Sequence, residues 1–143
     1  MGVTVKKIVL WRGKVENRPG MLAGVLAPAA TTRTDLRVVM GYREPGETRA
    51  VIELFPVGGK KLTAAMAAAG LGPSAIPTLL VTGDNRAGLC EAMARGVADA
   101  GINIAFVVAQ AVGRQFSAVF GFESEADAAR ATTLIKKAAG RRR

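Results

Sequence analysis

Apolar and polar residues recur along the chain in patterns that predict a strand, a helix, a hairpin and a second helix, in that order. Residues 5–15 are rich in apolar and β-branched side chains, which predicts a strand. After a short loop, apolar side chains recur at helical spacing from Leu22 to Ala29. Pro28 is expected to end or kink this first helix.

Residues 36–54 predict a hairpin, because two alternating runs flank a turn at Pro45 and Gly46. The apolar side chains of both runs are expected to form one buried face opposite Arg49 and Glu53. They are Leu36, Val38, Met40, Tyr42, Ala50, Ile52 and Leu54. Residues 59–69 then repeat apolar side chains at helical spacing and predict a second helix that stops at Gly70.

The same order of elements returns in the second half of the chain. The pattern predicts a strand at 78–82, a helix at 89–100, a hairpin at 103–110 and 115–122, and a last helix through Leu134 and Ile135. The stretch from Ser124 to Asp127 has the form of a capping box that begins this last helix.

The two halves align without gaps at an offset of 68 residues. Identical pairs include Asn17 with Asn85, Arg18 with Arg86, Gly20 with Gly88, Val39 with Val107, Ala50 with Ala118 and Val51 with Val119. We therefore predict an α+β fold of ferredoxin-like βαββα(β) modules in tandem, residues 1–75 and 76–143, each an antiparallel sheet with helices on one face. The fourth strand of each module is weak in the sequence. It is vestigial, or a partner or the long N-terminal strand supplies it.

Composition agrees with a folded protein. Half of the 143 residues are hydrophobic, which suffices for a core. No apolar run approaches the roughly 18 to 20 residues of a membrane helix, and the run at 8–11 is too short for a signal peptide. We expect a soluble, cytoplasmic protein.

The reactive residue types argue against an enzyme. The chain contains no histidine and one cysteine, Cys90, so neither a disulfide framework nor a multi-cysteine metal site is expected, and no cofactor is implied. Cys90 is expected to be a small buried side chain. The carboxylates are few and scattered, and no pair of them has a spacing typical of acid–base catalysis.

The net charge of +9 raises the question of nucleic-acid binding. Five basic residues lie among the last eight positions, and without them the net charge is +4: Lys136, Lys137, Arg141, Arg142 and Arg143. We interpret this basic tail as a frayed, solvated end that could contact RNA or an acidic partner.

Two similar stretches stand between a predicted strand and a predicted helix, Glu16 to Leu22 and Asp84 to Cys90. Backbone N–H groups at a helix start lack intrahelical partners, and the helix dipole is positive there, so the position suits a carboxylate or a phosphate. Asn17 and Asn85 are able to cap the turn or to bind a ligand, and the glycines allow a ligand to approach the backbone. Such residues are also ordinary turn residues, and their recurrence is what favours a site.

The Glu-Asn-Arg-Pro-Gly-Met-Leu stretch, the alanine-rich helix after it and the following Asp35-Leu36 resemble the ACT domain. This family is a small-molecule-sensing module in regulatory regions of enzymes such as phosphoglycerate dehydrogenase and aspartokinase. The likeness covers nearly the whole chain as a free-standing tandem pair. It implies two modules packed side by side that bind an amino acid at their interface. It also implies a non-catalytic, homo-oligomeric regulatory protein whose partner is a regulated enzyme or another protein.

Carried over residue by residue, the resemblance implies two ligand sites. The first contains Asn17, Gly20, Leu22 and Asn103, and the second contains Asn85, Gly88, Cys90 and Asp35. Helix-start amides suit the carboxylate of an amino acid, and Asn or Asp oxygens suit its ammonium. Ala87 replaces the usual proline of the family, so the second loop is less preorganised.

Two other functions stay open. Residues 114–120 partly resemble the aromatic third-strand motif of RNA-recognition domains, but the register of the repeat places the phenylalanines on a predicted core face. They are Phe116, Phe120 and Phe122. The second alternative is a ligand-free dimerisation or assembly module that uses open sheet edges.

Overall fold

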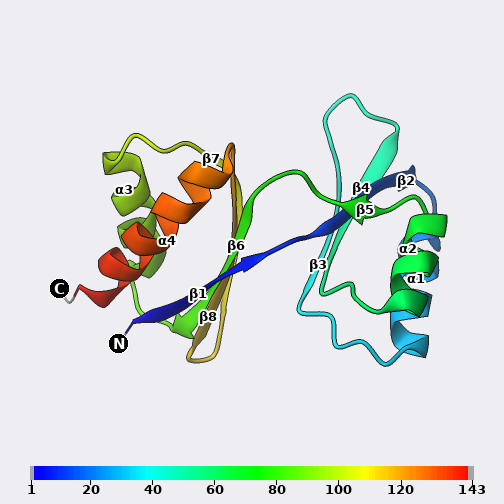
Figure 1. Ribbon diagram of the computed structural model, residues 1–143, viewed down its shortest axis with the longest axis horizontal. Coiled ribbons are helices and arrows are strands. Elements are labelled where there is room, and N and C mark those ends of the chain that lie inside the picture. Colours follow the sequence, from blue (N-terminus) through cyan, green and yellow to red (C-terminus); the bar gives the residue numbers. More distant parts are fainter. Residues whose placement is uncertain (1, 142–143) are drawn as a thin grey trace. The chain divides into compact units, whose positions relative to one another are not determined.

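A computed structural model describes residues 2–141 of the chain. The chain divides into two compact units. One is Val9–Ala75, called the first module below; the other joins the residues up to Ile8 with those from Ile76 onward and is called the second module. Each module has one four-stranded antiparallel sheet with two helices on one face (Figure 1). The fold is the predicted tandem of ferredoxin-like α+β modules.

The first module contains β2 (Trp11–Glu16), α1 (Met21–Thr31), β3 (Val38–Arg43), β4 (Arg49–Phe55), α2 (Lys60–Ala68) and β5 (Gly72–Pro73). Its strands follow the order β3-β4-β2-β5. Apolar side chains of β2, β4 and both helices form its core, with Leu54, Leu62 and Met66 almost fully buried. The first helix passes through Pro28 and ends at Thr31.

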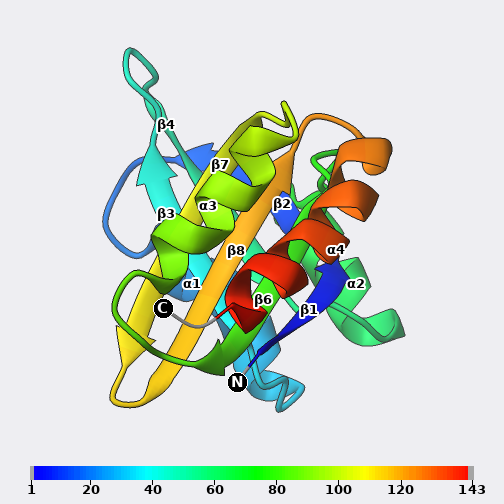
Figure 2. The same ribbon diagram turned by 90° about the vertical axis from the view of Figure 1, so that its left-hand side faces the viewer.

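The second module contains β1 (Val3–Ile8), β6 (Thr78–Asp84), α3 (Leu89–Asp99), β7 (Ile104–Val112), β8 (Gln115–Phe122) and α4 (Glu125–Gly140). Its strand order is β1-β6-β8-β7, and Figure 2 views it from the side on which α3 and α4 cross the sheet. Phe116, Phe120 and Phe122 lie in its core, as the register of the repeat predicted. They are therefore not an exposed platform for stacking RNA bases.

The predicted strand at 5–15 is in fact two strands that serve different modules. β1 pairs antiparallel with β6, with Val5 opposite Val81, and supplies the fourth strand of the second module. β2 is a central strand of the first module, whose own fourth strand, β5, has only two residues. A run rich in apolar and β-branched residues, interrupted by lysines and Gly13, does not reveal such a division, because both pieces are half-buried strands. The residues up to Ile8 thus lie with the second module, whereas the sequence repeat placed them in the first.

The prediction of one buried face for the first hairpin is wrong. Met40 pairs with Glu53 and Tyr42 with Val51, so the apolar side chains of β3 share a face with Glu53. The helix-facing side of the sheet carries Ile52 instead. Alternation within each strand was predicted correctly, but the connection at 44–48 sets the register between the strands, and a shift of one residue exchanges the faces. Glu53 is 2% exposed rather than solvent-facing.

The two ends of α4 also bear on the predictions. The Ser124 hydroxyl oxygen accepts a hydrogen bond from the Asp127 N–H at 3.0 Å, which confirms the N-terminal cap. The helix continues to Gly140, so Lys136 and Lys137 belong to it and not to a frayed tail. The remaining tail prediction for residues 142 and 143 lies outside the described residues.

Candidate functional site

Each module has a loop that leads from a strand into a helix through a left-handed glycine. Gly20 precedes α1 with a φ of 87°, and Gly88 precedes α3 with a φ of 82°. Glycine adopts this conformation without strain, which explains the residue type more directly than ligand approach does. No described side chain caps either helix start, although Asn17 and Asn85 were candidates for that role. Both helix starts can therefore offer backbone N–H groups to an anion.

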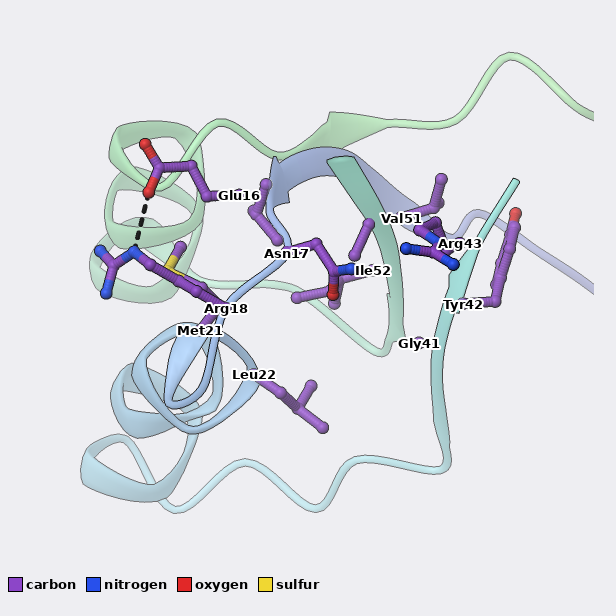
Figure 3. Close-up of a pocket in the computed structure, with 12 residues that line it drawn as sticks. Glu16, Asn17, Arg18, Met21, Leu22, Gly41, Tyr42, Arg43, Val51 and Ile52 are labelled. Atoms are coloured by element: carbon purple, nitrogen blue, oxygen red, sulfur yellow. Dashed lines mark hydrogen bonds and ion pairs between the residues drawn. The ribbon is translucent and has the colours of Figure 1, made fainter. Parts of the chain in front are cut away.

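A pocket of about 270 Å³ lies beside the start of α1 (Figure 3). The loop and the first turn of α1 form one side, the end of β3 forms the other, and β4 lies between them. The pocket is lined by Val15, Glu16, Asn17, Arg18, Met21, Leu22, Gly41, Tyr42, Arg43, Ala50, Val51 and Ile52. Figure 3 shows the Asn17 and Arg43 side chains extending toward each other from the two sides.

A pocket of about 410 Å³ lies at the corresponding place in the second module. It is lined by Asn85, Arg86, Gly88, Leu89, Cys90, Glu91, Ala109, Gln110, Ala111 and Phe116. Seven of these residues follow a residue of the first pocket by 68 positions: Asn85, Arg86, Leu89, Cys90, Ala109, Gln110 and Ala111. The repeat therefore extends from the sequence to the pockets.

The arginine that follows the loop asparagine has different partners in the two modules. Arg18 forms an ion pair with Glu16, with 2.7 Å between Nε and Oε2. Arg86 donates from Nη2 to the carbonyl oxygens of Ala139 at 3.1 Å and Arg141 at 3.0 Å. Its cation therefore satisfies carbonyl groups at the end of α4, where the helix dipole favours positive charge.

Tyr42 connects the first pocket to a buried carboxylate. Its hydroxyl donates to Glu53 Oε2 at 2.7 Å, and Arg12 Nε lies 3.9 Å from the other Glu53 oxygen. Burial and the hydrogen bond to Glu53 raise the pKa of Tyr42 above its ordinary value of 10.0. The phenol is consequently protonated at neutral pH and holds its donor toward Glu53.

The eight predicted site residues fall into three groups. Asn17 and Leu22 line the first pocket, and Gly20 lies directly before α1. Asn85, Gly88 and Cys90 line the second pocket. The predicted burial of Cys90 is wrong: the thiol is exposed, because Leu89, one position earlier, is the residue that enters the core.

Asp35 and Asn103 line neither pocket among the described residues. Asp35 forms an ion pair with Arg37 at 3.1 Å, and the Asn103 amide donates to Glu123 at 3.1 Å. Their assignment to sites completed by the other module came from the family resemblance and stays a prediction.

Sequence reasoning missed the side of each pocket formed by the edge strand. Gly41, Tyr42 and Arg43 line the first pocket, and their counterparts at 109–111 line the second. The repeat offset relates these two segments, but only the strand pairing shows that they lie opposite the loops.

No protein-family model and no curated protein matches the chain. Solved structures are similar over nearly its whole length. A protein from Bacteroides thetaiotaomicron has a TM-score of 0.74 at 12% identity, with 90% of this chain and 88% of that chain covered. The ligand-free regulatory subunit of aspartate kinase from Thermus thermophilus has a TM-score of 0.65 at 17% identity, with 96% and 97% covered.

A larger enzyme contains the same arrangement as one part. E. coli aspartokinase III, solved with aspartate and ADP, has a TM-score of 0.56 at 12% identity, and the match covers 95% of this chain and 32% of that one. Structural similarity at such low sequence identity establishes the fold of the chain. The chain has the fold of a tandem ACT-like pair, as the loop stretches predicted.

Two further observations concern metal binding and membrane-spanning helices. Residues 2–141 contain no group of three or more metal-ligating side chains placed to hold a metal ion. No helix in that part of the chain has the length and apolarity needed to span a membrane.

Proposed function

We propose that this protein is a non-catalytic regulatory protein that binds a small amino acid beside its strand–helix loops and transmits occupancy to a partner protein. The observation that carries the proposal is the recurrence of one pocket at corresponding places in two modules. A turn that served only to connect elements would not need to keep an asparagine, an uncapped helix start and a cavity together twice.

The pocket chemistry suits an α-amino acid. The N–H groups at the start of α1 can bind its carboxylate, and the Asn17 amide, with a donor and an acceptor, can bind either polar end. A volume of about 270 Å³ suits a small metabolite, since pockets for drug-sized ligands span roughly 300–1,000 Å³. Sensing of an abundant metabolite needs only micromolar to millimolar affinity, about −4 to −8 kcal/mol.

The regulatory part of the proposal rests on fold likeness. Similar structures include aspartate kinase regulatory subunits, and this chain spans 97% of the one from Thermus thermophilus. Small modules of this kind act by differential affinity of the ligand for two states of a complex. The partner is therefore expected to be an enzyme or another protein whose state depends on ligand occupancy.

A thermal-shift screen of the full chain against the twenty amino acids tests the proposal. A ligand present at 100 times its Kd stabilises the folded protein by about 2.7 kcal/mol, which is easily measured. Asn17→Ala and Asn85→Ala should each reduce the shift, and Thr133→Ala, on an exposed position of α4, is the matched control. A screen with no shift rejects the ligand, and a shift unaffected by both asparagine variants rejects the site.

Single variants of Asp35 and Asn103 test whether a ligand is shared between modules. If the sites are completed by the other module, Asn103→Ala should weaken binding as Asn17→Ala does. The double variant Asn17→Ala/Asn103→Ala should then abolish ligand-induced stabilisation. Neither side chain lines a pocket of its own module, so a wild-type response in both Asp35→Ala and Asn103→Ala confines binding to the loop pockets.

A specific observation also favours self-assembly as a second function. The edge strand β7 carries no charged residue and exposes Val107, Val108 and Val112 by 46%, 49% and 70%. An exposed, uncharged edge strand is a template for pairing with a second copy, which would give a homo-oligomer. Light scattering after size exclusion should show a smaller species for Val108→Lys than for Thr133→Lys, with and without amino acids. An unchanged mass excludes this edge.

A further inference from the structure

The first pocket has a cation where the second has a methyl group. Arg43 ends β3 and lines the first pocket, and its counterpart 68 positions later, Ala111, lines the second. Within residues 2–141, Arg43 forms no ion pair, whereas Arg18 on the opposite side of the same pocket is neutralised by Glu16. Arg43 is therefore the cation of the first pocket that no carboxylate among the described residues neutralises.

The charge balance of the two pockets differs accordingly. Glu16, Arg18 and Arg43 are the charged residues that line the first pocket, so its lining carries one net positive charge, to which the start of α1 adds. In the second pocket, Arg86 is bound to backbone carbonyls and Glu91 pairs with Arg95 at 2.6 Å. That pocket is larger but has no cation left for a ligand.

We propose that the first pocket selects amino acids with a second carboxylate and that Arg43 determines this specificity. The inference rests on the proposed function and names its ligand class. One carboxylate binds at the N–H groups of the α1 start and Asn17, and the other faces Arg43 across the pocket. Between these two ends lie the apolar side chains of Met21 and Ile52, while Arg43 itself is exposed at the end of β3.

The geometry of the guanidinium supports a carboxylate in particular. Its planar set of donors matches the two oxygens of a carboxylate, and a paired hydrogen bond of this kind is shorter and stronger than a neutral one. A neutral amide in the same place offers a single acceptor oxygen and two N–H groups that repel the cation. The side chains of an acid and its amide have nearly the same size, so the comparison isolates charge.

Isothermal titration of the full chain with L-aspartate, L-asparagine, L-glutamate and L-glutamine tests this specificity. We expect one of the acids to bind about five-fold more tightly than its amide, because a charge-assisted hydrogen bond to an exposed arginine replaces a neutral one. Arg43→Ala should remove that preference by weakening acid binding more than amide binding. Arg43→Lys should keep part of it. Arg49→Ala is the matched control, since Arg49 is exposed on the neighbouring strand and does not line the pocket.

The outcomes separate this inference from the function on which it rests. Binding of amides or other neutral amino acids with no preference for acids, or an acid preference that survives Arg43→Ala, overturns the specificity and leaves amino-acid sensing intact. Absence of binding by all twenty amino acids rejects both. Gain of acid binding by Ala111→Arg in an Asn17→Ala background would transfer the specificity to the second pocket and support the role of this position.

Discussion

Gly13 is the position where one added methyl group should be most informative about the first module. It lies in the central strand β2, and a Cβ there would be 2.5 Å from the Gly70 carbonyl oxygen and 3.0 Å from the Leu71 Cγ. The Gly70 contact is with backbone that follows α2, which cannot turn away as a flexible side chain can. We predict that Gly13→Ala destabilises the module.

The size of the effect follows from this geometry. The Gly70 oxygen must move by roughly 0.9 Å to reach the 3.4 Å at which ordinary contact begins. Overpacking of a well-packed interior costs about 1–3 kcal/mol, and alanine recovers about 0.4–1 kcal/mol by reducing the entropy of the unfolded chain. The net loss is about 1–2 kcal/mol, and a domain of this size then unfolds about 5–15 °C lower.

Thermal and urea unfolding followed by circular dichroism measures this loss. Gly41→Ala on β3 is the matched control, because nothing lies within 4 Å of its added Cβ and its φ is not positive. That control should be neutral or slightly stabilising. If Gly13→Ala is as stable as the wild type while Gly41→Ala behaves as expected, the close approach of the Gly70 backbone to β2 is wrong.

Three more expectations rest on single contacts. A Cβ at Gly121 would overlap the ring of Phe106, so Gly121→Ala and Phe106→Ala should be coupled by about 0.5–3 kcal/mol in a double-mutant cycle. Tyr42→Phe leaves Glu53 without its donor and should cost about 1–3 kcal/mol in denaturant unfolding. Because folding raises the pKa of Tyr42, its contribution is present below the ordinary value of 10.0 and is lost as the pH rises through the raised pKa, a slope that Tyr42→Phe should remove. Ser124→Ala should cost about 0.5–2 kcal/mol and speed amide exchange in the first turn of α4.

The repeat offset was the most informative feature of the sequence. It predicted two modules of one fold, the strand–helix loops in both, and the core positions of the phenylalanines in β8. It did so because hydrophobic periodicity reports which face of an element is buried, and a duplicated module must bury the same face twice.

Features that depend on how elements pair were beyond this reasoning. The division of the N-terminal run into β1 and β2 requires knowing which sheet each half joins. The register of β3 against β4 is set by the turn between them, so the faces of Met40 and Tyr42 were assigned wrongly. The pocket residues on β3 could not be predicted for the same reason, because a residue such as Arg43 faces a loop that is distant in the sequence.

The two pockets also differ in a way that separates anchoring from selection. The residues shared by both modules, the loop asparagines and the left-handed glycines, stand at the helix starts, where any carboxylate can bind. The residue that differs on the pocket side of the edge strand, Arg43 against Ala111, stands at the end of that strand. On the proposed function, the loop binds the carboxylate that all amino acids share, and the strand end selects the ligand by its side chain. Exchange of residues at the strand end should therefore alter ligand choice without disturbing the helix start, whereas a change at Gly20 should weaken every ligand alike.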